Sequence, residues 1–139
     1  MKYKHVVLHH TGGPTVFQIV EDELPEPGPN EVRVKILAAG VSFSEVLMRH
    51  GQYPGAPAMP FTPGYDMVGV VEKLGTGVSA FEMGEMVAAL TVYGGYSQYI
   101  CLPEEEGYKP SCCRNASIAA LTSGARSCCI QWPQPWKLV

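Results

Sequence analysis

The sequence has no cysteine before Cys101, no long hydrophobic run and no strong excess of either charge. Its formal net charge of -3 gives no electrostatic reason to expect nucleic acid or an anionic membrane as a partner. The N-terminal apolar stretch covers only residues 6–8, too short for a signal peptide or for a membrane span of about 20 residues. We therefore expect a cytoplasmic chain with no membrane partner and no nucleic-acid partner.

The cysteines themselves lie towards the C-terminus, and four of them form the adjacent pairs Cys112-Cys113 and Cys128-Cys129. A secreted disulfide scaffold spreads its cysteines through the fold, which indicates that these are reduced thiols. Adjacent cysteines rarely chelate one zinc ion, because zinc-binding cysteines are usually separated by two residues. We expect no metal site in these pairs.

The chain length and the glycine and proline content indicate one small domain rich in turns. With 139 residues and 46% hydrophobic residues, the chain can bury one core. Its 15 glycines and 12 prolines favour short strands joined by turns over long helices. The strands that we expect cover residues 3–8, 16–20, 31–38, 67–74, 86–90 and 96–102.

The stretch 31–38 alternates most clearly, with Val32, Val34 and Ile36 on one face. Arg33 and Lys35 are expected on the opposite face, in water. Strands and helices do not alternate along the chain, so the pattern predicts a mainly β fold. We expect a partly open β-barrel with one or two short helices.

One short helix is predicted after the third strand. Ser42 or Ser44 can cap its start, and it should end near Arg49. The N–H groups at the start of a helix can hold an oxygen-rich ligand. The expected apolar side of this helix consists of Phe43, Val46 and Leu47.

The run Gly75-Thr76-Gly77 looks like the start of a dinucleotide-binding fingerprint. That fingerprint needs a strand, a glycine turn and then a helix, but here residues 81–87 continue into another strand. The run therefore predicts a turn between two strands, and we expect no Rossmann domain in this chain.

A larger set of motifs occurs in one order along residues 3–106, and these motifs include Ala38-Ala39-Gly40-Val41-Ser42-Phe43, Gly51-Gln52-Tyr53-Pro54 and Pro63-Gly64-Tyr65-Asp66. The others are residues 11–14, 25–32, 67–71, 74–78, 81–87 and 94–99. Together they resemble the quinone oxidoreductase (zeta-crystallin-like) branch of the medium-chain dehydrogenase/reductase family. The resemblance implies a GroES-like barrel, with the Rossmann domain of the full-length enzyme absent.

The resemblance also implies a function. Full-length members transfer a hydride from NADPH to a quinone, an enone or a related carbonyl compound. Residues 1–106 would be the catalytic domain of such an enzyme, cut off before its nucleotide-binding domain. We expect this fragment to be inactive alone, to bind NADPH weakly if at all, and to associate or form homo-oligomers through apolar surface.

The residues implied beside the cofactor are Ser42, Phe43, Tyr53 and Tyr65, with Tyr53 as the candidate catalytic proton donor. Zinc-dependent relatives have a cysteine at the position of Ser42 and a histidine at that of Tyr65. Hydroxyl groups are poor zinc ligands, so we expect no metal. Without the resemblance, Gly64 and Gly69 would be read as turns and the tyrosines as packing residues.

We expect residues 107–139 to be an atypical C-terminal tail. The alternatives are a frameshifted or different C-terminus and a disordered tail. A second hypothesis for function is a non-catalytic barrel that binds a partner protein or a small hydrophobic ligand. A truncated product without function is a third.

Overall fold

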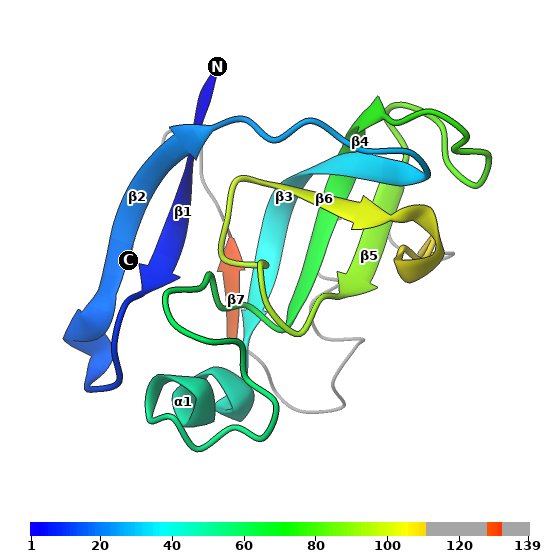
Figure 1. The fold of residues 1–139 in the computed structure, drawn as a ribbon. Coiled ribbons are helices and arrows are strands. Elements are labelled where there is room, and N and C mark those ends of the chain that lie inside the picture. The colour runs from blue at the N-terminus through cyan, green and yellow to red at the C-terminus, as the bar shows by residue number, and fades with distance from the viewer. Residues whose placement is uncertain (111–127, 132–139) are drawn as a thin grey trace.

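The structure is a computed structural model that describes residues 1–110 and the strand at 128–131 (Figure 1). The hypotheses about residues 111–127 and 132–139, including Cys112-Cys113 and the frameshifted or disordered tail, lie outside the described residues. The elements are β1 (Lys2–Leu8), η1 (Pro14–Val16), β2 (Phe17–Glu23), β3 (Glu31–Val41), α1 (Phe43–Arg49), β4 (Asp66–Leu74), β5 (Met86–Leu90), β6 (Tyr99–Pro103), η2 (Glu104–Glu106) and β7 (Cys128–Gln131).

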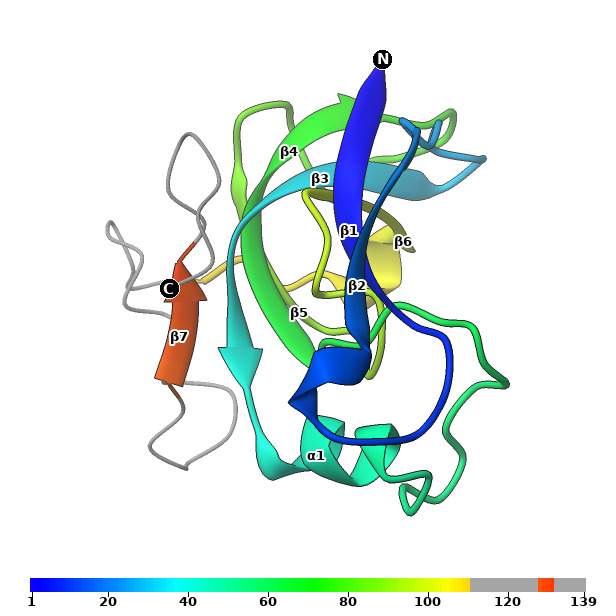
Figure 2. The same cartoon turned by 90° about the vertical axis from the view of Figure 1, so that its left-hand side faces the viewer.

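The strands form two antiparallel sheets. One contains only β1 and β2, and the other has the order β5-β4-β3-β6, with β7 also paired to β3. In Figure 2 the strands β3 and β4 curve together around the core, with the β1–β2 pair in front. The larger sheet does not close into a complete barrel. This confirms the predicted mainly β fold with one short α-helix, and the described residues contain no Rossmann domain.

Strand β3 is the centre of the larger sheet. Along one edge it pairs with β4, and along the other its residues 31–35 pair with β6 and its residues 38–41 with β7. Among the elements that the structure describes, no helix is long and apolar enough to cross a membrane.

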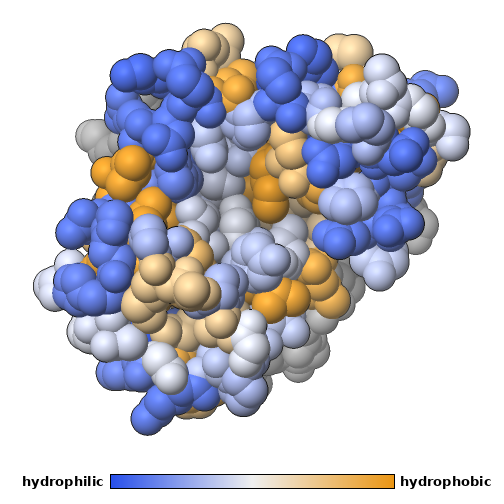
Figure 3. All heavy atoms as spheres, viewed as in Figure 1, coloured by the Kyte–Doolittle hydropathy of each residue, from blue (hydrophilic) through white to orange (hydrophobic). Residues whose placement is uncertain are grey.

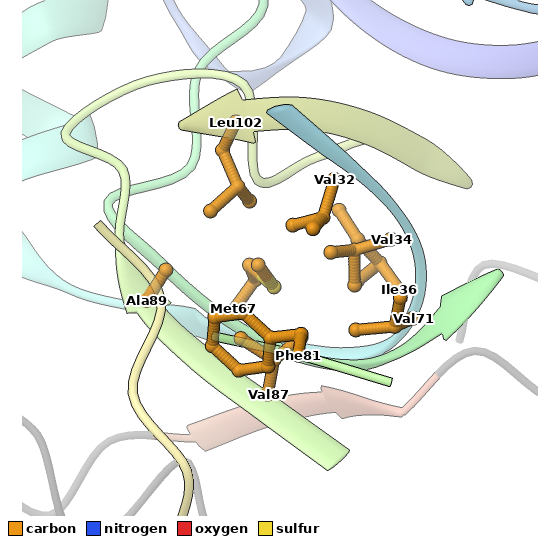
Figure 4. Close-up of a cluster of buried hydrophobic side chains, with 9 residues drawn as sticks. All are labelled: Val32, Val34, Ile36, Met67, Val71, Phe81, Val87, Ala89 and Leu102. Carbon is orange, nitrogen blue, oxygen red and sulfur yellow. The ribbon is translucent and has the colours of Figure 1, made fainter. Parts of the chain in front are cut away.

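The core lies inside the curved sheet (Figure 4). It forms because the alternating side chains of β3 face those of the neighbouring strands, and burying each large apolar side chain contributes about 1.5–3 kcal/mol. Its members come from β3, β4, β5 and β6 and from the segment between β4 and β5. They are Val32, Val34, Ile36, Met67, Val71, Phe81, Val87, Ala89 and Leu102.

The prediction that Arg33 on β3 faces water is wrong, because its side chain is only 6% exposed. Its Nε donates to Glu72 Oε2 at 2.6 Å, and its Nη1 donates to the carbonyl of Pro25 at 2.9 Å and to Glu26 Oε1 at 3.2 Å. These acceptors take the place of the water molecules that the guanidinium loses on burial. The alternation pattern cannot show such partners, because they come from other segments.

The last strand of the described core domain is shorter than the predicted 96–102. Residues 96–98 bond mainly to β1: the Tyr96 carbonyl accepts from Val6 N at 2.8 Å, and Gln98 N donates to the Lys4 carbonyl at 2.9 Å. Only the Gln98 carbonyl also reaches β3, where it accepts from Ile36 N at 2.9 Å. Strand β6 starts only at Tyr99, where the chain turns to pair with β3. The segment therefore links the two sheets.

Gly64 allows two backbone segments to lie unusually close. Its φ is +115°, and a Cβ at this position would lie 2.5 Å from Tyr96 N and 2.6 Å from Gly95 Cα. Gly84 also has a positive φ, of +86°, but a Cβ there would meet no atom within 4 Å. An alanine at Gly84 would add backbone strain only, whereas an alanine at Gly64 would add both strain and a steric clash.

We expect the substitution Gly64→Ala to lower the free energy of unfolding by about 3 kcal/mol, because it combines strain with a backbone clash. The control Gly84→Ala should cost only about 1 kcal/mol, since it adds strain alone. Urea unfolding followed by circular dichroism measures both values. Equal losses in the two variants would show that the close approach at Gly64 is not a constraint.

Candidate functional site

The structure brings three of the four predicted site residues together. Ser42 precedes α1, Tyr53 lies in the loop after it and Tyr65 immediately precedes β4. The rings of Tyr53 and Tyr65 meet edge to face, with centroids 6.4 Å apart and an interplanar angle of 74°. Ser42 and Tyr65 both bond to the side chain of Glu45. Phe43, the fourth predicted residue, points outward and is 72% exposed.

Glu45 is the residue at the centre of this arrangement, and the sequence analysis did not select it. Its side chain is 3% exposed. Oε2 accepts from Ser42 N at 2.8 Å and from Ser42 Oγ at 2.5 Å, while Oε1 accepts from Tyr65 N at 2.8 Å. In the described part of the chain no salt bridge joins Glu45 to a cation. Its charge is therefore stabilised by hydrogen-bond donors alone.

The predicted apolar side of α1 needs correction. The buried residues of this helix are Glu45 and Met48, three residues apart on one face. Met48 is fully buried against Leu8, Val16 and Phe61, which explains which face turns inward. Phe43 is exposed, whereas Val46 and Leu47 are half-buried.

The predicted cap at Ser42 is confirmed. Its side chain accepts from Ser44 N at 3.2 Å, and Glu45 completes a capping box by accepting from Ser42 N. The N–H groups of Ser42 and Ser44 at the helix start are thus bonded within the protein. The structure gives no support to an anion site there.

The main chain of Tyr65 is fixed from both sides. Its N–H donates to Glu45, and its carbonyl accepts from Val92 N at 3.0 Å. Thr91 Oγ1 also donates to the preceding carbonyl, that of Gly64, at 2.9 Å. Val92 has φ +61°, a left-handed conformation that is costly for a β-branched residue, at about 1–3 kcal/mol. The loop carries this strain where it contacts the candidate site.

Hydrogen bonding with the side chain of Tyr65 raises the pKa of Tyr53, and burial and the charge of Glu45 act in the same direction. Tyr53 is therefore a protonated phenol at neutral pH. It can donate a hydrogen bond, but it is a weaker acid than a free tyrosine. A role for Tyr53 as catalytic proton donor stays a prediction.

A second buried carboxylate lies beside the first. Asp66 is 5% exposed, and its Oδ1 accepts from Gly40 N at 2.7 Å. Tyr96 is 6% exposed, and its hydroxyl has no hydrogen-bond partner among the described residues. Burial, followed by the charges of Glu45 and Asp66, strongly raises the pKa of Tyr96. The interior next to the site thus contains two carboxyl side chains and a hydroxyl with no partner among the described residues.

His5 connects the β1–β2 sheet to the segment before Tyr65. Its Nε2 lies 2.8 Å from Asp22 Oδ2 and its Nδ1 lies 2.7 Å from Thr62 Oγ1. These contacts anchor the loop that ends at Pro63 and Gly64. They give His5 a structural role.

No group of three or more histidine, cysteine, aspartate or glutamate side chains within residues 1–110 is arranged to hold a metal ion. The Ser42 hydroxyl faces the Glu45 carboxylate instead. The absence of zinc stays a prediction.

Comparison with known proteins adds independent information. Residues 28–130 match the family model described as the alcohol dehydrogenase GroES-like domain. The quinone oxidoreductase of Rattus norvegicus is 39% identical over 99 residues, which are 70% of this chain and 30% of that protein. The chain thus spans less than a third of the length of this relative.

Solved structures show the same arrangement of strands. The human synaptic vesicle membrane protein VAT-1 homolog-like protein superposes with a TM-score of 0.80 at 31% identity, over 86% of this chain and 39% of that chain. A mycobacterial protein solved in complex with NADPH gives a TM-score of 0.74 at 31% identity, over 84% of this chain and 36% of that chain.

The unpaired hydroxyl of Tyr96 gives a test of this buried region. We expect Tyr96→Phe to be at least as stable as the wild type at pH 7, because an unpartnered buried hydroxyl costs about 1–3 kcal/mol. The unfolded chain ionises Tyr96 near pH 10.0, whereas the folded chain keeps the proton to higher pH. The wild type should therefore lose stability relative to Tyr96→Phe as the pH rises above about 10.

Urea unfolding of both proteins at pH 7, 9 and 10.5 measures this difference. A loss of more than about 1 kcal/mol in Tyr96→Phe at pH 7 would mean that the hydroxyl has a bonding partner in solution, such as an ordered water.

Proposed function

Because the chain belongs to the alcohol dehydrogenase GroES-like domain family, we propose that it is the substrate-side domain of an NADPH-dependent oxidoreductase. Its relatives include quinone oxidoreductases, which supports an N-terminal oxidoreductase domain. The proposed reaction is hydride transfer to a quinone, an enone or a related carbonyl compound. The observation that carries the proposal is the Tyr53–Tyr65 pair held beside Ser42 by one buried carboxylate.

The described residues suit one end of the cofactor. NADPH supplies the hydride when bound, and the similar mycobacterial protein was solved with it. We propose that the binding site for the nicotinamide ring and the substrate, called the seat below, is lined by Ser42, Phe43, Tyr53 and Tyr65. Edge-to-face tyrosines and an exposed Phe43 offer flat apolar surface with hydroxyl groups for orientation.

The described residues contain no binding site for the cofactor phosphates. The turn at residues 75–77 follows β4. Its Gly75 N donates to the Glu31 carbonyl at 2.8 Å and is therefore not free to bind a phosphate. Strand β5, and no α-helix, follows this turn within residues 1–110, whereas a dinucleotide fingerprint needs an α-helix directly after the glycine turn. We therefore propose that this chain is inactive alone and that another domain holds the phosphates.

The chemistry proposed for the site uses hydroxyl groups without zinc. Tyr53 keeps its proton at neutral pH and can donate a hydrogen bond to the carbonyl oxygen that gains charge as the hydride arrives. The Ser42 hydroxyl donates its only proton to the Glu45 carboxylate, whereas Tyr53 would turn its proton from the neutral phenol of Tyr65 to the substrate. Tyr53 would then supply the proton and water would restore it.

One groove supports the second hypothesis, a barrel that binds a partner protein or a small hydrophobic ligand. It has a volume of about 590 Å³ and lies between the end of β5 and strand β6. At its rim Leu90 is 45% and Tyr93 is 52% exposed. Figure 3 shows hydrophobic surface as separate patches between hydrophilic regions, which offers places for association or for a homo-oligomer contact.

A cytoplasmic location is also proposed. It is supported by the free, half-buried thiol of Cys101, whose pKa is raised to about 11 by burial and neighbouring carboxylates. A thiol that stays protonated at neutral pH is unreactive, as expected of an unpaired cysteine in a reducing compartment.

The fragment hypothesis predicts that the purified chain binds NADPH no more tightly than it binds nicotinamide, because the phosphates would have no binding site. Titration of NADPH followed by cofactor fluorescence measures this directly. Binding of NADPH clearly tighter than that of nicotinamide would contradict the hypothesis, since the chain would then contain a phosphate site of its own. Oxidation of NADPH by the chain with a small quinone would contradict it as well.

In a chimera that joins residues 1–106 to the nucleotide domain of a quinone oxidoreductase, we expect Tyr53→Phe to lower kcat about 100-fold. KM should change little if the hydroxyl acts only as the charge develops. Tyr93→Phe is the matched control, because that exposed tyrosine lies outside the tyrosine pair. Unchanged kcat in the Tyr53→Phe chimera would remove Tyr53 from the mechanism.

A further inference from the structure

The hydrogen bonds at Ser42 account for its only hydroxyl proton. A serine hydroxyl has one proton to donate and two lone pairs that accept. Ser42 Oγ donates its proton to Glu45 Oε2 at 2.5 Å, and one lone pair accepts from Ser44 N at 3.2 Å. One lone pair remains on the half-buried oxygen.

Glu45 enforces this orientation because a buried carboxylate can only accept. It is 3% exposed, and the same oxygen that takes the Ser42 hydroxyl also takes the Ser42 N–H, at 2.8 Å. Turning the hydroxyl outward would leave a buried charge with one donor fewer, which is costly in a low-dielectric interior. The short 2.5 Å contact is typical of a charge-assisted bond.

We propose that Glu45 is a positioning residue that makes the Ser42 side chain an acceptor only, so that the ligand group lying over Ser42 must be a hydrogen-bond donor. Glu45 acts through Ser42 and, by holding Tyr65 N at 2.8 Å, it also fixes the neighbouring tyrosine wall. The inference rests on the proposed function, because it concerns the ligand seat described there.

The two sides of the seat therefore differ in hydrogen bonding: Ser42 accepts, and the tyrosines donate. A carboxamide N–H₂ fits over Ser42, whereas a ketone oxygen would face a lone pair and be repelled. Carbonyl oxygens are then directed to the tyrosine pair, because phenols, unlike the Ser42 oxygen, can turn a proton toward them. Ser42 and the tyrosine pair would therefore recognise opposite ends of a polar ring system.

Two small probes of nearly the same shape test this polarity in the purified chain. Nicotinamide carries an N–H₂ donor where 3-acetylpyridine carries a methyl group, and both keep the carbonyl and the pyridine ring. Nitrogen–proton correlation spectra report binding through the amide signals of Ser42, Ser44 and Tyr65. For the wild type we expect nicotinamide to bind about fivefold more tightly, as one hydrogen bond implies.

Variants show whether Glu45 causes the preference. Glu45→Met removes the acceptor and should bring the affinity ratio of the two probes close to one. Glu45→Gln should lower the ratio only in part, because its single amide oxygen can accept from Ser42 only while its N–H₂ faces the N–H of Tyr65. Glu85→Gln is the control carboxylate, since Glu85 lies at the surface and bonds to Lys109. A purely structural role of Glu45 would weaken both probes equally and leave their ratio unchanged.

If Glu45→Met does not fold, Ser42→Ala provides the second test, because removing the oxygen should also abolish the preference. Equal affinities of the two probes in the wild type would overturn the inference while leaving the proposed seat intact. A preference that survives in Glu45→Met or Ser42→Ala would overturn it too. If neither probe shifts the Ser42 or Tyr65 signals, both the inference and the nicotinamide seat of the proposed function are wrong.

Discussion

Two buried carboxylates hold the candidate site together through backbone N–H groups. Asp66 binds the end of β3 at Gly40, and Glu45 binds the start of α1 at Ser42 and the segment before β4 at Tyr65. Each charge would be strongly unfavourable in the interior if these donors were absent. The three segments therefore depend on one another, because moving any one of them leaves an anion without its donors. The orientation of Ser42 and the position of Tyr65 both follow from this arrangement.

The sequence predicted those features that depend on local rules. The strands β1 to β5 were found close to their observed bounds because alternation and turn residues act over a few positions. The cap at Ser42 was found for the same reason. Arg33 and the start of β6 were predicted wrongly, since their environments are set by distant segments. Glu72 accepts from Arg33 across the sheet, and β1 takes the residues that precede Tyr99.

The residues that the family resemblance selected lie together in part, but Glu45, which connects them, was not among them. Ser42, Tyr53 and Tyr65 do lie together, whereas Phe43 faces solvent. A signal for Glu45 was present, because a serine followed three residues later by glutamate is the pattern of a capping box. That pattern predicts the bond to Ser42 N but not the one to Tyr65 N. The unpaired hydroxyl of Tyr96 has no local signal at all, since burial there comes from packing between the sheets.

The position of β3 in the sheet also affects how the protein is made. One edge of this strand pairs with β4, which follows it closely, but the other edge waits for β6 and β7, which are synthesised much later. Ribosomes add about 5–20 residues per second, so that edge stays unpaired for several seconds on each nascent chain. An unpaired edge of Val and Ala residues is a template for strands of neighbouring chains. The central strand of the finished domain is thus the part most in need of protection while the chain is being translated.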